Sequence, residues 1–374
     1  MGRQIYDGSD KGECLDVAER IVDGDAESWQ REWATLAPRI EDRAHTTLSN
    51  GDVAGARAPY LRACTYYRAP LFIMKPQEAD FRSHWRKMRS CFREAAALFA
   101  PPIEQIEVPF EGELLPGYFW KPDESGQRRP TLIVIGGIET FAEDCYFMTG
   151  TSGLHRGYNA MTLDLPGQGV NPERGLFFGA RMESPIRAVL DYAVHHPEID
   201  AHRLALFGFS WGGHIVFKGG QHDQRIKALI ANPPMPNVFR AVLAQQKGRD
   251  RSDPIARIVF EQIAWRMGLK ISLNVNDIAR RAAKAYDYLA HGSADPHKIA
   301  CPTLCLAGEG EAPITLKIAR ECIEHLPHPM KKLRIFTQED GSEAHCQVDN
   351  LALPNRVMFD WLDKVFSSRE RQQP

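Results

Sequence analysis

The spacing of apolar side chains changes near residue 103, and this change separates two kinds of structure. Before it, apolar and aromatic residues recur every three or four positions in the stretches 29–40, 53–71 and 81–99. Such a period is typical of amphipathic helices. We therefore expect residues 1–102 to form an appendage of three helices, the second bent at Pro59, that docks on the rest of the protein.

Beyond residue 103 the apolar residues come in short runs, which is typical of strands. The runs at 106–110 and 114–120 favour an antiparallel pair. Six further runs alternate with helix-length segments such as 186–196 and 314–326, which predicts a doubly wound, mostly parallel α/β sheet. The six predicted parallel strands are residues 131–135, 160–163, 204–207, 228–231, 303–307 and 333–336.

One interval is too long for an ordinary connection between two strands. About seventy residues separate the predicted strand that ends near Asn232 from the one that begins at Thr303. Amphipathic spacing within it predicts helices rather than a loop. We expect residues 235–299 to be a helical cap over the carboxyl ends of the strands, inserted into a core domain of residues 103–234 and 300–374.

The composition of the chain limits the kinds of molecule that it could bind. The chain has 374 residues, of which 43% are hydrophobic, and its formal net charge is −2. That charge provides no basic surface for nucleic acid or for an anionic membrane. No apolar run approaches the ~20 residues of a membrane span, and the first residues lack the apolar segment of a signal peptide, so a cytoplasmic protein is expected. The eight cysteines are expected to be reduced thiols.

The sequence Gly-Phe-Ser-Trp-Gly at residues 208–212 directly follows a predicted strand and precedes a helix-compatible stretch. A Gly-x-Ser-x-Gly motif in this context predicts a nucleophile elbow, a sharp turn that exposes the serine hydroxyl above the sheet. The small neighbours Gly208 and Gly212 would tolerate the cramped backbone of that turn. Ser210 is therefore the candidate nucleophile.

A serine hydroxyl needs a base that a carboxylate orients, in the chain order Ser, acid, His. His345 lies in a loop between the last predicted strand and the terminal helix, whereas His325 and His328 sit at a helix end between prolines. We choose His345 as the base. The loop after residue 307 offers Glu311 as the acid and Glu309 as the alternative, with Asp340 a distant third. These assignments predict a Ser-His-Glu triad.

An oxyanion hole requires two backbone N–H donors. The amide of Trp211, directly after the nucleophile, would be one. The other is expected from Gly137 or Ile138, in a glycine pair that follows the first parallel strand. The chain contains no Walker loop, no dinucleotide-binding Gly-x-Gly-x-x-Gly motif after a first strand and no His-Glu-x-x-His motif, so we expect neither a metal nor a nucleotide cofactor.

Together, the elbow at 208–212, the glycine pair at 136–137, the Asp-Leu-Pro-Gly-Gln-Gly turn at 164–169 and His345 resemble the α/β-hydrolase superfamily. The appendage, including Ala-Cys-Thr-Tyr-Tyr-Arg at 63–68, is similar to a narrower group. That group comprises the dihydroxypseudooxynicotine hydrolase, the fungal yellowish-green polyketide-shortening hydrolases and the fermentation-respiration switch-like proteins. The resemblance implies an enzyme that cleaves a carbon–carbon bond flanked by carbonyls, often in aromatic or polyketide metabolism.

The function expected from these residues is hydrolysis of a carbonyl-containing small molecule at a β-diketone-type carbon–carbon bond or an ester bond. The same residues could serve a lyase that eliminates a carboxylate, or an acyltransferase or cyclase acting on a natural-product intermediate. A peptidase is the weaker alternative, because the N-terminal segment shows no propeller repeats. The aromatic stripes of the appendage suggest a homodimer.

Overall fold

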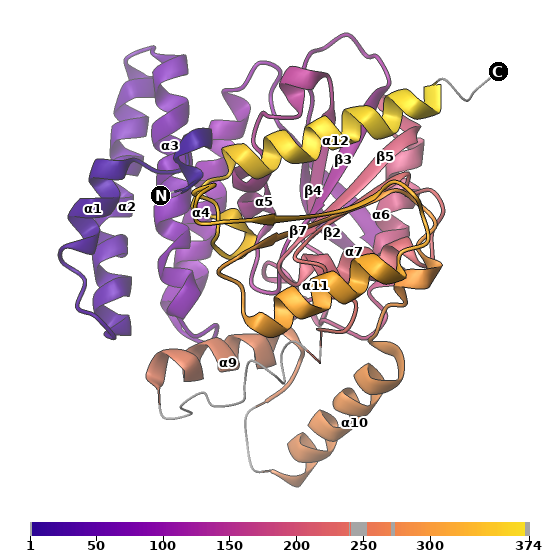
Figure 1. The fold of residues 1–374 in the computed structure, drawn as a ribbon. Coiled ribbons are helices and arrows are strands. Elements are labelled where there is room, and N and C mark those ends of the chain that lie inside the picture. The colour runs from indigo at the N-terminus through magenta and orange to yellow at the C-terminus, as the bar shows by residue number, and fades with distance from the viewer. Residues whose placement is uncertain (1, 239, 241–252, 271–273, 371–374) are drawn as a thin grey trace. The chain divides into compact units, whose positions relative to one another are not determined.

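The computed structural model describes residues 2–238, 240, 253–270 and 274–370. The chain divides into two compact units. The first contains Met1–Glu104 and Asp250–Trp265, and the second contains Gln105–Arg249 and Arg266–Pro374. The helices and strands of both units are labelled in Figure 1.

The first unit is helical, as the spacing of its apolar residues predicts. Asp25 and Asp52 precede two of its helices; Asp25 accepts two backbone N–H groups of the first turn and Asp52 accepts one. The helix that contains Pro59 continues through it from residue 53 to 68. The helices are α1 (Lys11–Ala18), α2 (Ala26–Ser49), α3 (Val53–Arg68), α4 (Ala79–Ala97) and most of α9 (Pro254–Arg266), with 3₁₀ turns at Gly2–Tyr6 and Pro70–Ile73.

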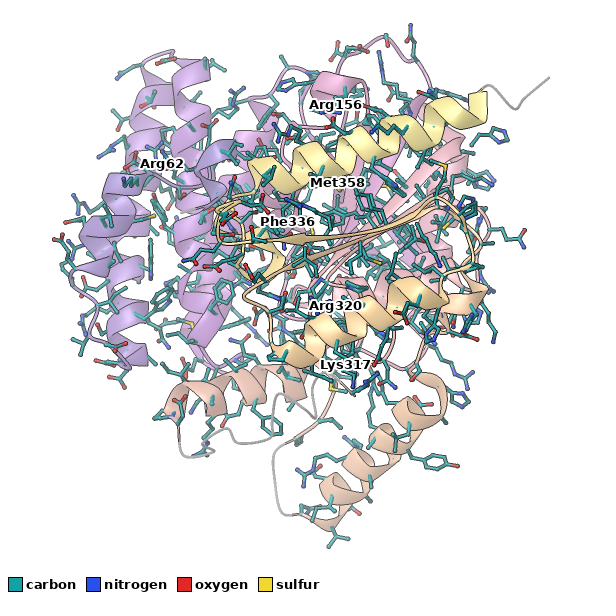
Figure 2. The ribbon with its side chains drawn as sticks, viewed as in Figure 1. Arg62, Arg156, Lys317, Arg320, Phe336 and Met358 are labelled. Carbon is teal, nitrogen blue, oxygen red and sulfur yellow. The ribbon has the colours of Figure 1, made fainter. Side chains whose placement is uncertain are left out.

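Several aromatic side chains of this unit are buried. They include Tyr60, Tyr67, Phe81 and Phe92. At its surface, Arg62 on α3, labelled in Figure 2, pairs with Glu13 on α1 at 3.0 Å. Other aromatic residues of the stripes, Trp29, Trp33 and Trp85, are half-buried. The homodimer expected from these stripes stays a prediction.

The second unit contains an eight-stranded sheet in the order β1-β2-β4-β3-β5-β6-β7-β8. β2 runs antiparallel to β4, and the pairs from β4 through β3 to β8 are parallel. The predicted mostly parallel α/β sheet is therefore confirmed. The strands are β1 (Glu104–Phe110), β2 (Glu113–Trp120), β3 (Arg129–Ile135), β4 (Asn159–Leu163), β5 (Ile199–Phe209), β6 (Ala228–Asn232), β7 (Thr303–Gly308) and β8 (Lys331–Phe336).

Helices accompany this sheet between and after the strands (Figure 1). Buried side chains such as Phe336 on β8 and Met358 on the terminal helix, both labelled in Figure 2, belong to its core. The helix after β3 was not predicted, because all eight of its side chains are buried and it has no amphipathic period. The helices are α5 (Ala142–Thr149), α6 (Glu183–His195), α7 (Gly212–Gly220), α10 (Val275–His291), α11 (Pro313–His325) and α12 (Ala352–Glu370).

The predicted cap, residues 235–299, contains two described helices at the two amphipathic segments noted in the sequence. One is α9 and the other is α10. Residues 239, 241–252 and 271–273 of the predicted cap lie outside the described residues. Among the residues that are described, no helix combines the length and the apolar character that a bilayer crossing requires.

Candidate active site

Ser210 occupies the turn between β5 and α7. Its φ of 55° lies in the left-handed region, which is rare for a residue with a side chain and is typical of a strained elbow. The Ser210 N–H donates to the carbonyl oxygen of Asn232 at 2.7 Å and so fixes the turn against the end of β6. A Cβ atom on Gly208 would collide with the Gly212 carbonyl oxygen, and one on Gly212 would collide with the Ile135 carbonyl oxygen, which explains why glycine stands on both sides of the serine. The predicted elbow geometry is present.

Three loops at the carboxyl ends of parallel strands bring three predicted site residues together. Ser210 follows β5, Glu311 follows β7 and His345 follows β8. The Ser210 hydroxyl lies 3.0 Å from Nε2 of His345. The other ring nitrogen, Nδ1, lies 2.6 Å from Oε1 of Glu311. With the proton on Nδ1, the imidazole donates to the carboxylate and its Nε2 lone pair accepts from the serine.

The other candidates for acid and base have different partners. Glu309 accepts the N–H of Gln338 at 3.2 Å and is exposed. Asp340 binds Arg334 at 2.7 Å and also accepts the N–H of Thr337. His325 stacks on His297 with ring centroids 4.8 Å apart. The geometry thus places Glu311, and none of these residues, against His345.

The electrostatic environment of His345 favours its protonated form. In its thiolate form the neighbouring Cys346 raises the pKa of His345 most, and the Glu311 carboxylate raises it further, because negative charge stabilises an imidazolium. Partial desolvation of the ring acts in the opposite direction. The neutral imidazole that a general base requires is consequently the form that dominates only at higher pH.

His214 is a second histidine near the elbow, one turn into α7. It is 1% exposed, and burial lowers its pKa to about 4. Its Nδ1 donates to the Met235 carbonyl at 3.0 Å. The His214 ring is therefore neutral, buried and hydrogen-bonded to the backbone. It does not compete with His345 for the Ser210 proton.

The loop after β3 approaches the nucleophile closely. A Cβ atom on Gly137 would lie 2.9 Å from the Ser210 Cβ and 3.2 Å from its Oγ, so only glycine leaves room for the serine hydroxyl. The Trp211 amide lies at the start of α7. Within the described part of the chain, no backbone acceptor in a turn, loop or cap takes the N–H of Trp211 or of Ile138. These amides can therefore serve as oxyanion donors.

A residue that the sequence analysis did not select sets the direction of this loop. Gln168, in the turn after β4, is 1% exposed. Its Nε2 donates to the carbonyl oxygens of Gly136 at 2.7 Å and Gly137 at 3.0 Å. In a trans peptide the C=O and the following N–H point in opposite directions. Gln168 therefore turns the N–H groups of Gly137 and Ile138 away from itself.

A buried guanidinium supports the same two loops. Arg266, at the end of α9, is 1% exposed and donates to the carbonyl oxygens of Gly167 at 3.0 Å and of Glu139 at 3.3 Å. The Asp164 carboxylate accepts the N–H of Ala142 at 2.7 Å. The turn at 164–169 thus helps to anchor the glycine loop. No pattern in a single sequence would have pointed to Arg266 in this role.

Gln168→Met should lower kcat by up to about 100-fold, because a methionine of similar shape cannot hold the two carbonyls and the oxyanion donors lose their fixed direction. KM should change little, since the substrate's ground-state contacts remain. Steady-state kinetics would measure both constants. Gln127→Met, at an exposed loop position, is the matched control. Equal kcat values for the two variants would contradict a role for Gln168 in directing the loop.

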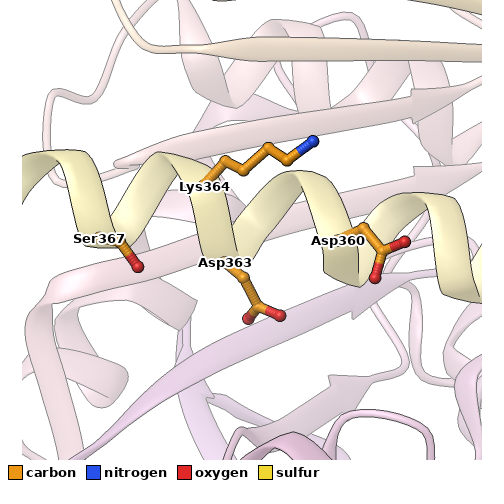
Figure 3. Close-up of a pocket in the computed structure, with 4 residues that line it drawn as sticks. All are labelled: Asp360, Asp363, Lys364 and Ser367. Carbon is orange, nitrogen blue, oxygen red and sulfur yellow. The ribbon is translucent and has the colours of Figure 1, made fainter.

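A surface hollow of about 390 Å³ runs along α12 and is lined by Asp360, Asp363, Lys364 and Ser367 (Figure 3). Arg156 pairs with Asp360 at 2.7 Å and with Asp363 at 2.9 Å. These carboxylates therefore serve an ion-pair network on the surface, and none of the predicted site residues lines the hollow. In the described part of the chain, no group of three or more His, Cys, Asp and Glu side chains is arranged to hold a metal ion.

Comparison with known proteins shows which proteins this chain resembles. Residues 5–297 match the esterase FrsA-like family. Hydrolase LUC6 of a Fusarium species is 27% identical, over 99% of this chain and 95% of that protein. The 20-hydroxy-prefusarin hydrolase FUS2 of Gibberella moniliformis is also 27% identical, over 98% and 94%. The crystal structure of 2,6-dihydroxy-pseudo-oxynicotine hydrolase superposes with a TM-score of 0.76 at 22% identity, over 97% of this chain and 95% of that one.

Proposed function

Because this chain belongs to the esterase FrsA-like family and has the α/β-hydrolase fold, we propose that it is a serine hydrolase in which Ser210 attacks a substrate carbonyl. The observation that carries the proposal is the continuous relay from Ser210 Oγ through His345 to Glu311, with separations of 3.0 and 2.6 Å. Both distances lie within the reach that proton transfer requires.

In the proposed reaction, Ser210 Oγ forms a bond to the carbonyl carbon while His345 Nε2 takes the hydroxyl proton. Glu311 accepts the hydrogen bond of Nδ1–H and stabilises the resulting imidazolium. The amides of Trp211 and of Gly137 or Ile138 bind the oxyanion. When the tetrahedral intermediate collapses, His345 returns its proton to the leaving carbon or oxygen, and water then hydrolyses the acyl-enzyme by the same steps.

The proposed substrate is a carbonyl-containing small molecule of secondary or aromatic metabolism. Two observations support this class. The relatives that match along nearly the whole chain are named hydrolases, and the name of one of them specifies a small organic substrate, 20-hydroxy-prefusarin. The formal net charge of −2 also argues against a polyanionic substrate. A β-diketone-type carbon–carbon bond and an ester bond both fit, because the leaving group in each accepts a proton from His345.

A fluorophosphonate probe tests the proposed nucleophile directly. Attack by Ser210 Oγ forms an oxygen–phosphorus bond and expels fluoride, while His345 takes the hydroxyl proton. We expect one covalent adduct by intact-mass spectrometry, located on Ser210 by peptide mapping and lost on denaturation before labelling. An adduct on another serine, or none at all, would argue against the assignment.

The bond that is broken can be identified from the products of a substrate panel. An aryl ester should yield a carboxylic acid and a phenol, whereas a β-diketone should yield a carboxylic acid and a ketone. Turnover of either class, abolished by the fluorophosphonate, supports the proposal and assigns the bond. Cleavage of peptides with no turnover of esters or diketones would instead indicate a peptidase.

A further inference from the structure

Asn232, the last residue of β6, contacts both loops that carry the proposed catalytic pair. Its backbone carbonyl accepts the Ser210 N–H at 2.7 Å and the Cys346 S–H at 3.4 Å. Its side-chain Nδ2 donates to Oε1 of Gln347 at 2.7 Å. One residue therefore holds the backbone of the nucleophile and the segment that directly follows His345.

The segment after His345 depends on such support because its backbone is strained. Cys346 and Gln347 have φ values of 56° and 53°, two successive left-handed conformations at residues that carry side chains. Strain of this kind persists only where the surrounding structure fixes it. The Gln347 side chain is fully buried, with 0% exposure, and it is Asn232 that provides its hydrogen bond.

From these contacts we infer that the Asn232–Gln347 side-chain pair is a positioning device for the reaction, which holds His345 Nε2 at its distance from Ser210 Oγ. The inference rests on the proposed function. Neither amide touches the reacting atoms, so both act through the loops that they join. The pair fixes the histidine loop, after β8, to the end of β6, where the nucleophile's own N–H is anchored.

Loss of this pair should affect the chemical step more than substrate binding. A displacement of reacting groups by about 1 Å can cost about 100-fold in rate. The proton transfer spans only the 3.0 Å between Ser210 Oγ and His345 Nε2, so it is sensitive to movement of the histidine loop. The expected signature is therefore a fall in kcat with KM nearly constant.

The decisive comparison is between two substitutions at one position. Gln347→Met keeps the shape and removes the acceptor, and we expect kcat and the rate of fluorophosphonate labelling to fall by about 10- to 100-fold. Gln347→Glu keeps an acceptor oxygen for Asn232 Nδ2 whether or not the carboxyl is protonated. It should restore most of both rates. Equal losses in the two variants would overturn the inference.

A buried asparagine elsewhere in the sheet provides the control for a general loss of stability. Asn159 on β4 is 1% exposed and donates to the Glu198 carbonyl at 2.8 Å. Asn159→Leu should lower the melting temperature while kcat of the folded enzyme stays near the wild-type value. If Gln347→Met behaves in the same way, the pair is merely structural and the inference fails.

A second route covers the case in which Gln347→Met does not fold. Asn232→Leu removes the same hydrogen bond from the other side and leaves the backbone carbonyl that anchors Ser210. If the pair acts as a unit, the double variant should lose no more activity than either single variant. A double variant whose fold-loss of activity equals the product of the two single losses would contradict a shared role.

These outcomes can be separated from failure of the proposed function. If wild-type protein is not labelled at Ser210, the serine mechanism itself is wrong. If the wild type is labelled and every variant at 232 and 347 is labelled at the same rate, the serine mechanism stands and the positioning role is rejected.

Discussion

Ser210→Ala is expected to lower kcat by a factor on the order of 10⁶, the largest effect of any single substitution in this chain. The variant retains the oxyanion donors, His345 and Glu311, but it has no oxygen that can form the acyl-enzyme. Substrate should still bind, because the change removes one atom from a residue whose main role is chemical. Product formation should be followed by chromatography, and thermal unfolding should be measured on the same samples.

The folded state should tolerate this substitution. Alanine meets the same backbone constraint at φ 55° as serine does, and the N–H bond to Asn232 does not involve the side chain. Ser367→Ala, on the exposed face of α12 (Figure 3), is the matched control and should keep full activity. Substantial hydrolysis by Ser210→Ala would reject Ser210 as the nucleophile. Retained elimination of a carboxylate would indicate that His345 acts alone as the base of a lyase.

The sheet could be predicted from the sequence because its strands are short, uniformly apolar and separated by regular intervals. Each of the six predicted parallel strands lies within an observed strand, and the predicted antiparallel pair corresponds to β1 and β2. The sequence did not predict helix α5, all of whose side chains are buried. Helix α5 has no polar face, so its eight residues give no helical period.

The principal site residues could be selected because each belongs to a local pattern that has a chemical reason. Ser210 lies in a strand–turn–helix motif, and His345 lies in the loop where the base is expected after the last strand. Between Glu309 and Glu311 the sequence offers only a spacing argument. In the structure, Oε1 of Glu311 lies 2.6 Å from Nδ1 of His345. Assignment of the acid remains a prediction until the variants are measured.

The supporting residues could not be selected, because their roles depend on distant segments meeting in space. Gln168 acts on carbonyls about thirty positions earlier in the chain, and Asn232 reaches Gln347 across 115 positions. An amide side chain is common and carries no local signature. The strand order of the sheet, which places β4 beside β3 and separates β6 from β8 by β7 alone, determines which loops these amides join.

Glu311→Gln is the second large prediction, with kcat expected to fall on the order of 10⁴-fold. A glutamine can present its N–H₂ group to Nδ1, which favours the tautomer with the proton on Nε2. That tautomer cannot accept the Ser210 proton. The loss therefore arises from a wrong tautomer and an unstabilised imidazolium, while the hydrogen-bonded shape of the site is kept. Steady-state kinetics over a range of pH would measure it.

The dependence of kcat/KM on pH should also change, and the pKa of His345 sets the direction of the change. Because Cys346 and Glu311 raise the pKa of His345, the inactive protonated form persists to higher pH in the wild type, and activity should rise as pH increases through that pKa. Without the Glu311 carboxylate, the pKa of His345 is raised less. The acid limb of kcat/KM should therefore move to lower pH in Glu311→Gln. Glu309→Gln, at the exposed neighbouring carboxylate, should change kcat by less than about threefold and leave the limb in place. A large loss in Glu309→Gln with a normal Glu311→Gln would reverse the assignment of the acid.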